Sequence, residues 1–174
     1  TSSDAQPNLR TVPVSNTFAG IEVGSKGVKM TIVESGNPKA AGSGISTVKD
    51  TSVNTDFISF TQASYQATLT GLSKLYEEAR NTYSIPSDHI FTAISSGVKG
   101  QADKENKNNW IDQLISAFKT NIREPERKVT IVDVVEEARL SHLGIIPDSR
   151  RYNTFLIDIG SGNTKGGYFP NGNT

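Results

Sequence analysis

The 174-residue sequence predicts a mixed α/β sheet with helical crossovers. One observation is the order of elements, in which three strand-like segments precede an alternation of helix, strand, helix, strand and helix. The other is a hairpin pattern that recurs 136 positions along the chain, with Ile21-Glu22-Val23-Gly24-Ser25 matched by Ile157-Asp158-Ile159-Gly160-Ser161. The repeat indicates the start of a second, similar half.

The first half of the chain predicts an antiparallel meander followed by a helix and a strand. Strands are expected at 18–24, 27–34 and roughly 42–49, and residues 50–59 are loop-like in composition. A helix from Thr61 to Tyr83 is favoured by apolar residues at helical spacing, namely Ala63, Ala67, Leu69, Leu72, Leu75, Tyr76, Ala79 and Tyr83. A strand at 90–94 follows Pro86 and ends in Ser95-Ser96-Gly97.

The second half predicts two more helices and one more strand before the repeated hairpin. A helix over about 104–121 would bury the stripe Trp110, Ile111, Leu114, Ile115 and Phe118. A strand follows at 129–132, and Asp133 with Glu136 resembles a capping box that begins a helix ending at Gly144. The expected organisation is a polar leader at 1–17, a domain at 18–146, and a link with the hairpin at 147–174.

Composition excludes several classes of function. Acidic and basic residues number 18 each, so bulk charge does not favour a nucleic acid duplex or a membrane surface. Cysteine is absent, which excludes disulfides, thiol catalysis and thiolate metal sites but leaves a bacterial cytoplasmic or periplasmic location open. No apolar run approaches the roughly 18 residues of a transmembrane segment. The polar leader is compatible with removal of a signal peptide or of a tag.

Each repeated hairpin combines a carboxylate, a small-residue turn and a lysine at the same offset, Lys29 and Lys165. Glycine permits positive φ and lets backbone N–H groups point outward. Consecutive N–H groups form an anion-binding nest, and a neighbouring carboxylate can hold a cation. One copy is typical of an ordinary hairpin; two copies predict a pair of phosphate-binding turns that face each other across a cleft.

Two further stretches carry a family resemblance. Glu136-Glu137-Ala138-Arg139-Leu140 is similar to the Glu-Glu-Ala-Arg-Leu signature of the exopolyphosphatase and guanosine pentaphosphate phosphohydrolase family. The stretch from Phe155 to Thr164 resembles that family's Asp-x-Gly-Gly-Gly-Ser-Thr motif, and the paired hairpins look like the phosphate motifs of the actin-like ATPase superfamily. The resemblance implies a ribonuclease H-like domain, with a mixed five-stranded sheet and packed helices, plus the first hairpin of the next domain.

The resemblance also implies an activity, hydrolysis of phosphoanhydrides in polyphosphate or guanosine pentaphosphate. Glu137 would be the general base, and Asp158 with Glu22 would hold Mg²⁺. Phosphate would be bound by Gly24, Ser25, Lys99, Gly160, Ser161, Gly162 and Thr164. The cleft would be completed by a missing second domain or by a second copy of the chain.

Other interpretations of the same residues stay open. The helix macrodipole alone favours glutamates such as Glu137 in a first turn, and Lys165 suits a solvated strand position. The sequence also departs from the family pattern, because Glu22 replaces an aspartate, Ser161 a glycine and Lys165 an acidic residue. These changes favour two alternatives, a degenerate phosphate- or nucleotide-binding module that no longer hydrolyses, or an actin-like structural ATPase.

Overall fold

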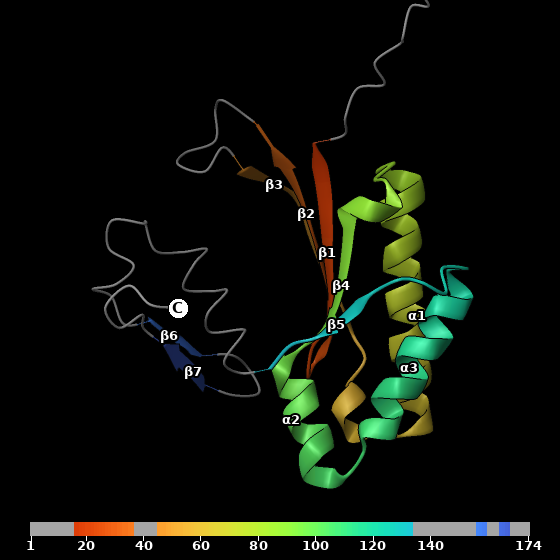
Figure 1. The fold of residues 1–174 in the computed structure, drawn as a ribbon, viewed down its shortest axis with the longest axis vertical. Helices are drawn as coiled ribbons and strands as arrows, with labels where there is room; N and C mark the ends of the chain where they lie inside the picture. Colours follow the sequence, from red (N-terminus) through yellow and green to blue (C-terminus); the bar gives the residue numbers. More distant parts are fainter. Residues whose placement is uncertain (1–15, 37–44, 134–155, 160–163, 168–174) are drawn as a thin grey trace, which may run out of the picture.

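The computed structural model describes residues 16–36, 45–133, 156–159 and 164–167. Its main feature is a five-stranded sheet in the order β3-β2-β1-β4-β5 (Figure 1). The strands are β1 (Thr17–Val23), β2 (Gly27–Ser35), β3 (Ile45–Asn54), β4 (Ile90–Ile94) and β5 (Val129–Ile131). Strands β1 to β3 are antiparallel, whereas β4 and β5 join in parallel. The predicted α/β class and the mixed five-stranded sheet are confirmed.

Alternation of side chains along the central strands explains why they form a sheet with one buried face. In β1, Ala19, Ile21 and Val23 are buried, while Gly20 and Glu22 are exposed on the opposite face. Strand β2 repeats this pattern with its own buried apolar residues, Val28, Met30 and Ile32. Period-2 alternation is the signature of a sheet with one face against a core, so these two strands were readable from the sequence.

Three helices complete the described domain. Helices α1 (Gln62–Glu77) and α3 (Asn108–Asn121) lie side by side on one face of the sheet, and α2 (Ser96–Glu105) lies at the end of β4 (Figure 1). A π-helical turn, η2 (Glu78–Thr82), extends α1, and two 3₁₀ turns, η1 (Phe57–Ser59) and η3 (Ser87–His89), precede α1 and β4. None of the helices in the described part of the chain is long and apolar enough to cross a bilayer.

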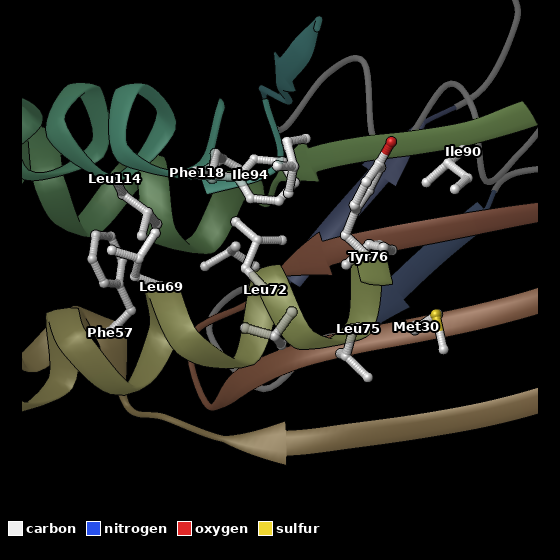
Figure 2. Close-up of a cluster of buried hydrophobic side chains, with 14 of the residues drawn as sticks. Met30, Phe57, Leu69, Leu72, Leu75, Tyr76, Ile90, Ile94, Leu114 and Phe118 are labelled. Carbon is white, nitrogen blue, oxygen red and sulfur yellow. The ribbon is translucent and has the colours of Figure 1, made fainter. Parts of the chain in front are cut away.

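The core lies between the helices and the buried face of the sheet. Figure 2 shows side chains of α1 and α3 meeting those of β2 and β4, with Leu72 and Phe118 near the centre. The tyrosine ring of Tyr76 packs edge-on against Phe118, with ring centroids 5.9 Å apart. This packing holds the sheet in place, and the candidate site lies where the carboxyl ends of its strands meet.

The apolar stripe expected along α1 is partly wrong. Its second half is buried as predicted, but Ala63 and Ala67 are exposed, and Ser64, Thr68 and Gly71 are buried instead. The helix approaches the sheet closely here, since a Cβ on Gly71 would lie 3.6–3.8 Å from side chains of Thr55, Val28 and Val53. The Thr68 hydroxyl donates to the Ser64 carbonyl at 2.7 Å, so polar groups are buried with a partner.

The helix expected over 104–121 begins four residues later, at Asn108, and a separate helix that was not expected, α2, precedes it. Asn106 adopts a left-handed conformation, with φ of 55°, and its N–H donates to carbonyls of Ala102 and Asp103. This geometry is a common C-terminal cap, and asparagine tolerates it better than most residues do. Helix α2 therefore ends at Glu105, and α3 begins at Asn108 with the predicted stripe buried or half-buried.

The third strand extends further than its composition indicated. Residues 50–54 belong to β3, where they pair with β2 down to Gly27, although they were expected to form a loop. Edge strands accept polar residues because one side of the strand faces water. Beyond Asp133, the helix predicted to end at Gly144 lies outside the described residues, and so does the start of the third strand at 42–44.

A polar network joins α1 to the loop that precedes β5. The Arg127 side chain is almost fully buried, and its guanidinium donates to Glu124 at 2.6 Å, to the Ile90 carbonyl at 2.7 Å and to the Ser87 carbonyl at 2.9 Å. It also lies 4.8 Å from the centre of the Tyr76 ring, whose hydroxyl donates to Glu124. One arginine thus connects three separate segments of the chain.

Replacing Arg127 with methionine should lower the free energy of unfolding by about 2–3 kcal/mol, because it removes charge-assisted bonds and leaves Glu124 without its cation. Chemical denaturation monitored by circular dichroism measures this loss. The exposed neighbour Lys128, changed to methionine, is the matched control and should stay within about 0.5 kcal/mol of the wild type. Equal loss in both variants would contradict the role of the network.

The same network should make stability depend on pH. Burial alone would raise the pKa of Glu124, but hydrogen bonds from Tyr76, Ser87 and Arg127 outweigh it and hold that pKa below its usual value. A lowered carboxyl pKa stabilises the fold above the unfolded-state pKa, and this contribution is lost as pH falls through the folded-state pKa. The stability difference between the wild type and the Arg127→Met variant should therefore narrow in acid.

Candidate functional site

The carboxyl ends of β1, β4 and β5 meet at one edge of the sheet, which we call the carboxyl edge. Val23 pairs with Ile94, and Ile94 pairs with Ile131, so the three strands end side by side. The Ser95 N–H donates to the Val23 carbonyl at 3.0 Å, and the Val132 N–H donates to the Ile94 carbonyl at 2.9 Å. In open α/β sheets ligands bind outside the carboxyl ends of strands, which makes this edge the candidate site.

The first turn of the carboxyl edge is closed by its own backbone. The Gly24 N–H donates to the Gly27 carbonyl at 2.8 Å, and the Lys26 carbonyl accepts from the Thr55 N–H at 3.1 Å. A glycine with positive φ was expected at this turn. Among the described residues the glycine with positive φ is Gly36, so the turn does not have the expected conformation. Ser25 and Lys26 supply the remaining N–H groups of the turn. Gly24 is thus a hairpin-closing residue in this structure.

Gly27, another glycine of the turn, has no room for a side chain. A Cβ on Gly27 would collide with the carbonyl group of Val53, coming 2.8 Å from the carbonyl carbon. The β3 backbone therefore approaches Gly27 too closely for a side chain. A Cβ on Gly24 would meet only ordinary contacts, the nearest being the Gly27 carbonyl oxygen at 3.5 Å.

Ser25 and Glu22 lie at this turn. Ser25 is buried, whereas Glu22 is exposed. A carboxylate oxygen of Glu22 lies 3.8 Å from where a Cβ on Gly24 would stand, so the carboxylate is beside the turn. The strand register places Lys29 directly across from Glu22. The structure thus brings together three of the predicted residues, Glu22, Gly24 and Ser25.

The amino terminus of α2 begins at the same edge. Ser95 is the N-cap, in extended conformation, and its hydroxyl oxygen accepts from the Val98 N–H at 3.3 Å. The N–H groups of a helix's first turn and the helix macrodipole favour an anion at this end. The bond between Ser95 and Val23 places this helix end beside the first turn.

Lys99 contacts groups away from the turn. Its ammonium donates to a carboxylate oxygen of Asp103 and to the Asn108 side-chain oxygen at 2.9 Å. The hydrogen bond from Lys99, and then the one from Asn108, lower the pKa of Asp103. In this structure Lys99 therefore joins α2 to the start of α3.

The second hairpin is present as a separate two-stranded sheet of β6 (Leu156–Ile159) and β7 (Thr164–Gly167). Asp158 is directly across from Lys165, and Thr164 is across from Ile159. The antiparallel pairing expected for this hairpin is confirmed. The predicted residues Glu137, Gly160, Ser161 and Gly162 lie outside the described residues, so their roles stay predictions.

Two residues of the carboxyl edge were not among the predicted site residues. Ser96 is buried in the first turn of α2, and Asp133 is exposed two residues beyond β5. Their position directly after strands was a usable signal, since parallel strands end at a common edge. Asp133 was instead interpreted only as a helix cap.

The described part of the carboxyl edge does not by itself make a magnesium site. Among the described residues, no group of three or more histidine, aspartate or glutamate side chains is placed to hold a metal ion. Magnesium requires oxygen ligands in octahedral geometry, and Glu22 has a lysine across from it. Mg²⁺ stays a prediction of the resemblance.

Comparison with known proteins identifies the fold. No protein-family model matches the chain, and no curated protein sequence matches it either. Among solved structures, a Ppx/GppA family member from Aquifex aeolicus matches with a TM-score of 0.59 and 16% identity, over 85% of this chain and 45% of that one. An exopolyphosphatase from Cytophaga hutchinsonii matches with a TM-score of 0.59 and 15% identity, over 90% of this chain and 47% of that one.

A third structure, an exopolyphosphatase-like protein, matches with a TM-score of 0.56 and 17% identity, over 85% of this chain and 43% of its own. The chain thus spans a little under half the length of each of these proteins. At such low identity the likeness concerns the fold. Together with the sheet order, the comparisons show that the chain has the fold of the Ppx/GppA proteins.

Proposed function

We propose that this protein is of the exopolyphosphatase type, binding polyphosphate or guanosine pentaphosphate at the carboxyl edge and hydrolysing a phosphoanhydride bond. One observation carries the proposal, the backbone hydrogen bond from Ser95 to Val23 that sets the first turn beside the amino terminus of α2. The first turn of α2 offers N–H groups and partial positive charge to an anion, and we infer that the Ser25 and Lys26 amides of the neighbouring hairpin turn add to them. The solved structures with this fold include proteins named as exopolyphosphatases.

The chemistry of anhydride hydrolysis suits such a site. Transfer of a phosphoryl group to water requires little covalent help from the protein; it requires positioning and stabilisation of negative charge. The Ser25 and Lys26 amides and the first turn of α2 would help to stabilise the negative charge. A carboxylate that orients and deprotonates water would supply the positioning, and Glu137 is the residue that we propose for this role.

Phosphate release tests this function directly. The full-length protein, incubated with long-chain polyphosphate, guanosine pentaphosphate and ATP in turn, should release phosphate from one of the first two faster than from ATP. Release from ATP alone, accompanied by nucleotide-dependent sedimentation, would favour an actin-like ATPase instead. No release from any of the three would reject the hydrolase.

The 174-residue chain alone should bind these ligands weakly. We propose that a closed cleft needs a second domain or a second copy, because the N–H groups of one hairpin would otherwise face bulk water. Isothermal titration of the chain with tripolyphosphate should give a Kd no tighter than about millimolar, or about −4 kcal/mol. Micromolar binding would show that this chain already holds a complete site.

One observation favours a second candidate, a module that binds phosphate without hydrolysing it. Lys29 lies directly across from Glu22, so the carboxylate beside the first turn has a cation as its neighbour. A carboxylate that has a lysine as its neighbour is less available to hold a metal cation beside a reacting phosphate. Binding without release in the assays above would select this candidate.

A further inference from the structure

One buried hydroxyl in the described part of the chain has no hydrogen-bond partner. Thr55, the residue that follows β3, is 6% exposed, and its Oγ1 is buried without a donor or acceptor among the described residues. Its methyl group lies toward α1, because a Cβ on Gly71 would be 3.6 Å from Thr55 Cγ2. A buried hydroxyl without a partner loses its hydration and gains nothing in return, so it destabilises the fold. Valine, which has the same shape, would avoid this loss.

Thr55 is joined directly to the first turn. Its N–H donates to the Lys26 carbonyl at 3.1 Å, and the N–H of Asp56 donates to the same oxygen at 3.3 Å. One residue earlier, Asn54 pairs with Gly27 across β2 and β3. The peptide groups of the turn therefore cannot shift without changing the surroundings of Thr55.

A second unfavourable feature lies at the next residue. Asp56 has a φ of 51° and a ψ of 48°, a left-handed conformation that residues other than glycine adopt uncommonly. Strained residues of this kind persist where the surrounding structure holds them, and they cluster at functional sites. The unpaired hydroxyl and the strained backbone thus occur side by side, in the segment that holds the Lys26 carbonyl.

We propose that Thr55 is a positioning residue for phosphate binding, and that its hydroxyl gains a hydrogen bond to the backbone of the first turn when that turn closes on a phosphate chain. The proposal rests on the proposed function, since it concerns the same turn. The hydroxyl is buried, so it acts through the turn and does not contact the ligand. A hydrogen bond that is missing in the free protein then contributes to the affinity for the ligand.

The substitution Thr55→Val tests the proposal, because it removes the hydroxyl and keeps the shape of the side chain. The free chain should melt about 2–5 °C higher, since valine leaves no polar atom unpaired. The Kd for tripolyphosphate, measured from the chemical shifts of the Ser25 and Lys26 amides in the ¹⁵N-labelled chain, should rise about three- to tenfold, as for loss of one hydrogen bond. Stability and affinity should thus change in opposite directions.

Two further variants separate the hydroxyl from other effects. Thr68→Val makes the same change at a buried hydroxyl that already has a partner, since Thr68 donates to the Ser64 carbonyl at 2.7 Å. It should melt lower than the wild type and keep its Kd within about twofold. Thr55→Ser keeps the hydroxyl and loses the methyl group, so it should also melt lower but bind as the wild type does.

Three results would overturn this inference and leave the proposed function standing. A Thr55→Val chain that melts at or below the wild-type temperature would show that the hydroxyl already has a partner in the free protein. Wild-type affinity in that variant would show that the hydroxyl has no part in binding, and equal weakening by Thr55→Ser would assign the effect to something other than the hydroxyl. Absence of any shift of the Ser25 and Lys26 amides, in every chain, would reject the proposed function and the inference with it.

Discussion

Replacing Gly27 with alanine is expected to lower the free energy of unfolding by about 3 kcal/mol, because the new Cβ would collide with the Val53 carbonyl group. The carbonyl belongs to the β3 backbone and cannot move without breaking its pairing with β2. Thermal unfolding should show a melting temperature about 6–12 °C lower for a chain of this size. The loss would be steric, since Gly27 does not have a positive φ.

Gly20 offers a matched control on the neighbouring strand. A Cβ there would meet no heavy atom within 4 Å, and its φ is also not positive. Gly20→Ala should leave stability unchanged or raise it by about 0.5–1 kcal/mol, because alanine loses less backbone entropy on folding. If the Gly27 and Gly20 variants melted at the same temperature, the close approach of β3 to the first turn would be refuted.

Changing Glu137 to glutamine is expected to lower the rate of polyphosphate hydrolysis by about 10²–10⁴, the usual contribution of a positioned general base. The amide can still orient a water but cannot take its proton. Stability should change little, because glutamine also suits the first turn of the predicted helix. Steady-state phosphate release by the full-length variant, with its melting temperature, measures both effects.

A variant of the neighbouring Glu136 distinguishes a catalytic effect from an effect of charge at the start of the predicted helix. Glu136→Gln removes the same charge from the same predicted helix turn, and its contribution there is explained by the macrodipole. It should leave the rate within about fivefold of the wild type, since a charge interacting with the macrodipole typically contributes at most about 1 kcal/mol. Glu137→Gln with wild-type turnover would remove that residue from the mechanism, and equal losses in both variants would assign the effect to charge alone.

Patterns of burial explain which elements were predictable from sequence. Strands β1, β2 and β4 have the strict alternation of a half-buried sheet, so their bounds were predicted within one residue. The buried stripe of α3 was equally clear from Ile111, Leu114 and Phe118. In both cases the spacing of the hydrophobic residues follows from the backbone geometry of the strand or the helix itself. It can therefore be recognised without knowing which element packs against it.

The elements that were missed depend on tertiary contacts or on single backbone conformations. Residues 50–54 become a strand only because β2 is beside them. Helix α2 contains two glycines and few apolar residues, and its end is set by the left-handed Asn106. The buried serine, threonine and glycine of α1 reflect how closely that helix approaches the sheet, which no periodicity reveals.

The candidate site shows the same division. Glu22, Gly24 and Ser25 were found because a repeated motif marks them, and the structure gathers them at one turn. Lys99 was inferred from resemblance, and the structure shows it bound to Asp103 and Asn108. The role of Gly27 depends on a strand 26 positions away, and only coordinates reveal that approach.

The hydrogen bond from Ser95 to Val23 has a consequence for how fast a ligand could be captured. It joins the first turn to α2 through main-chain atoms, so both are in place before any anion arrives. A preorganised platform of this kind loses little chain entropy on association, and the cost of ordering falls on the ligand. Association at this platform would then be governed by diffusion and long-range charge, and its rate constant would fall as ionic strength rises.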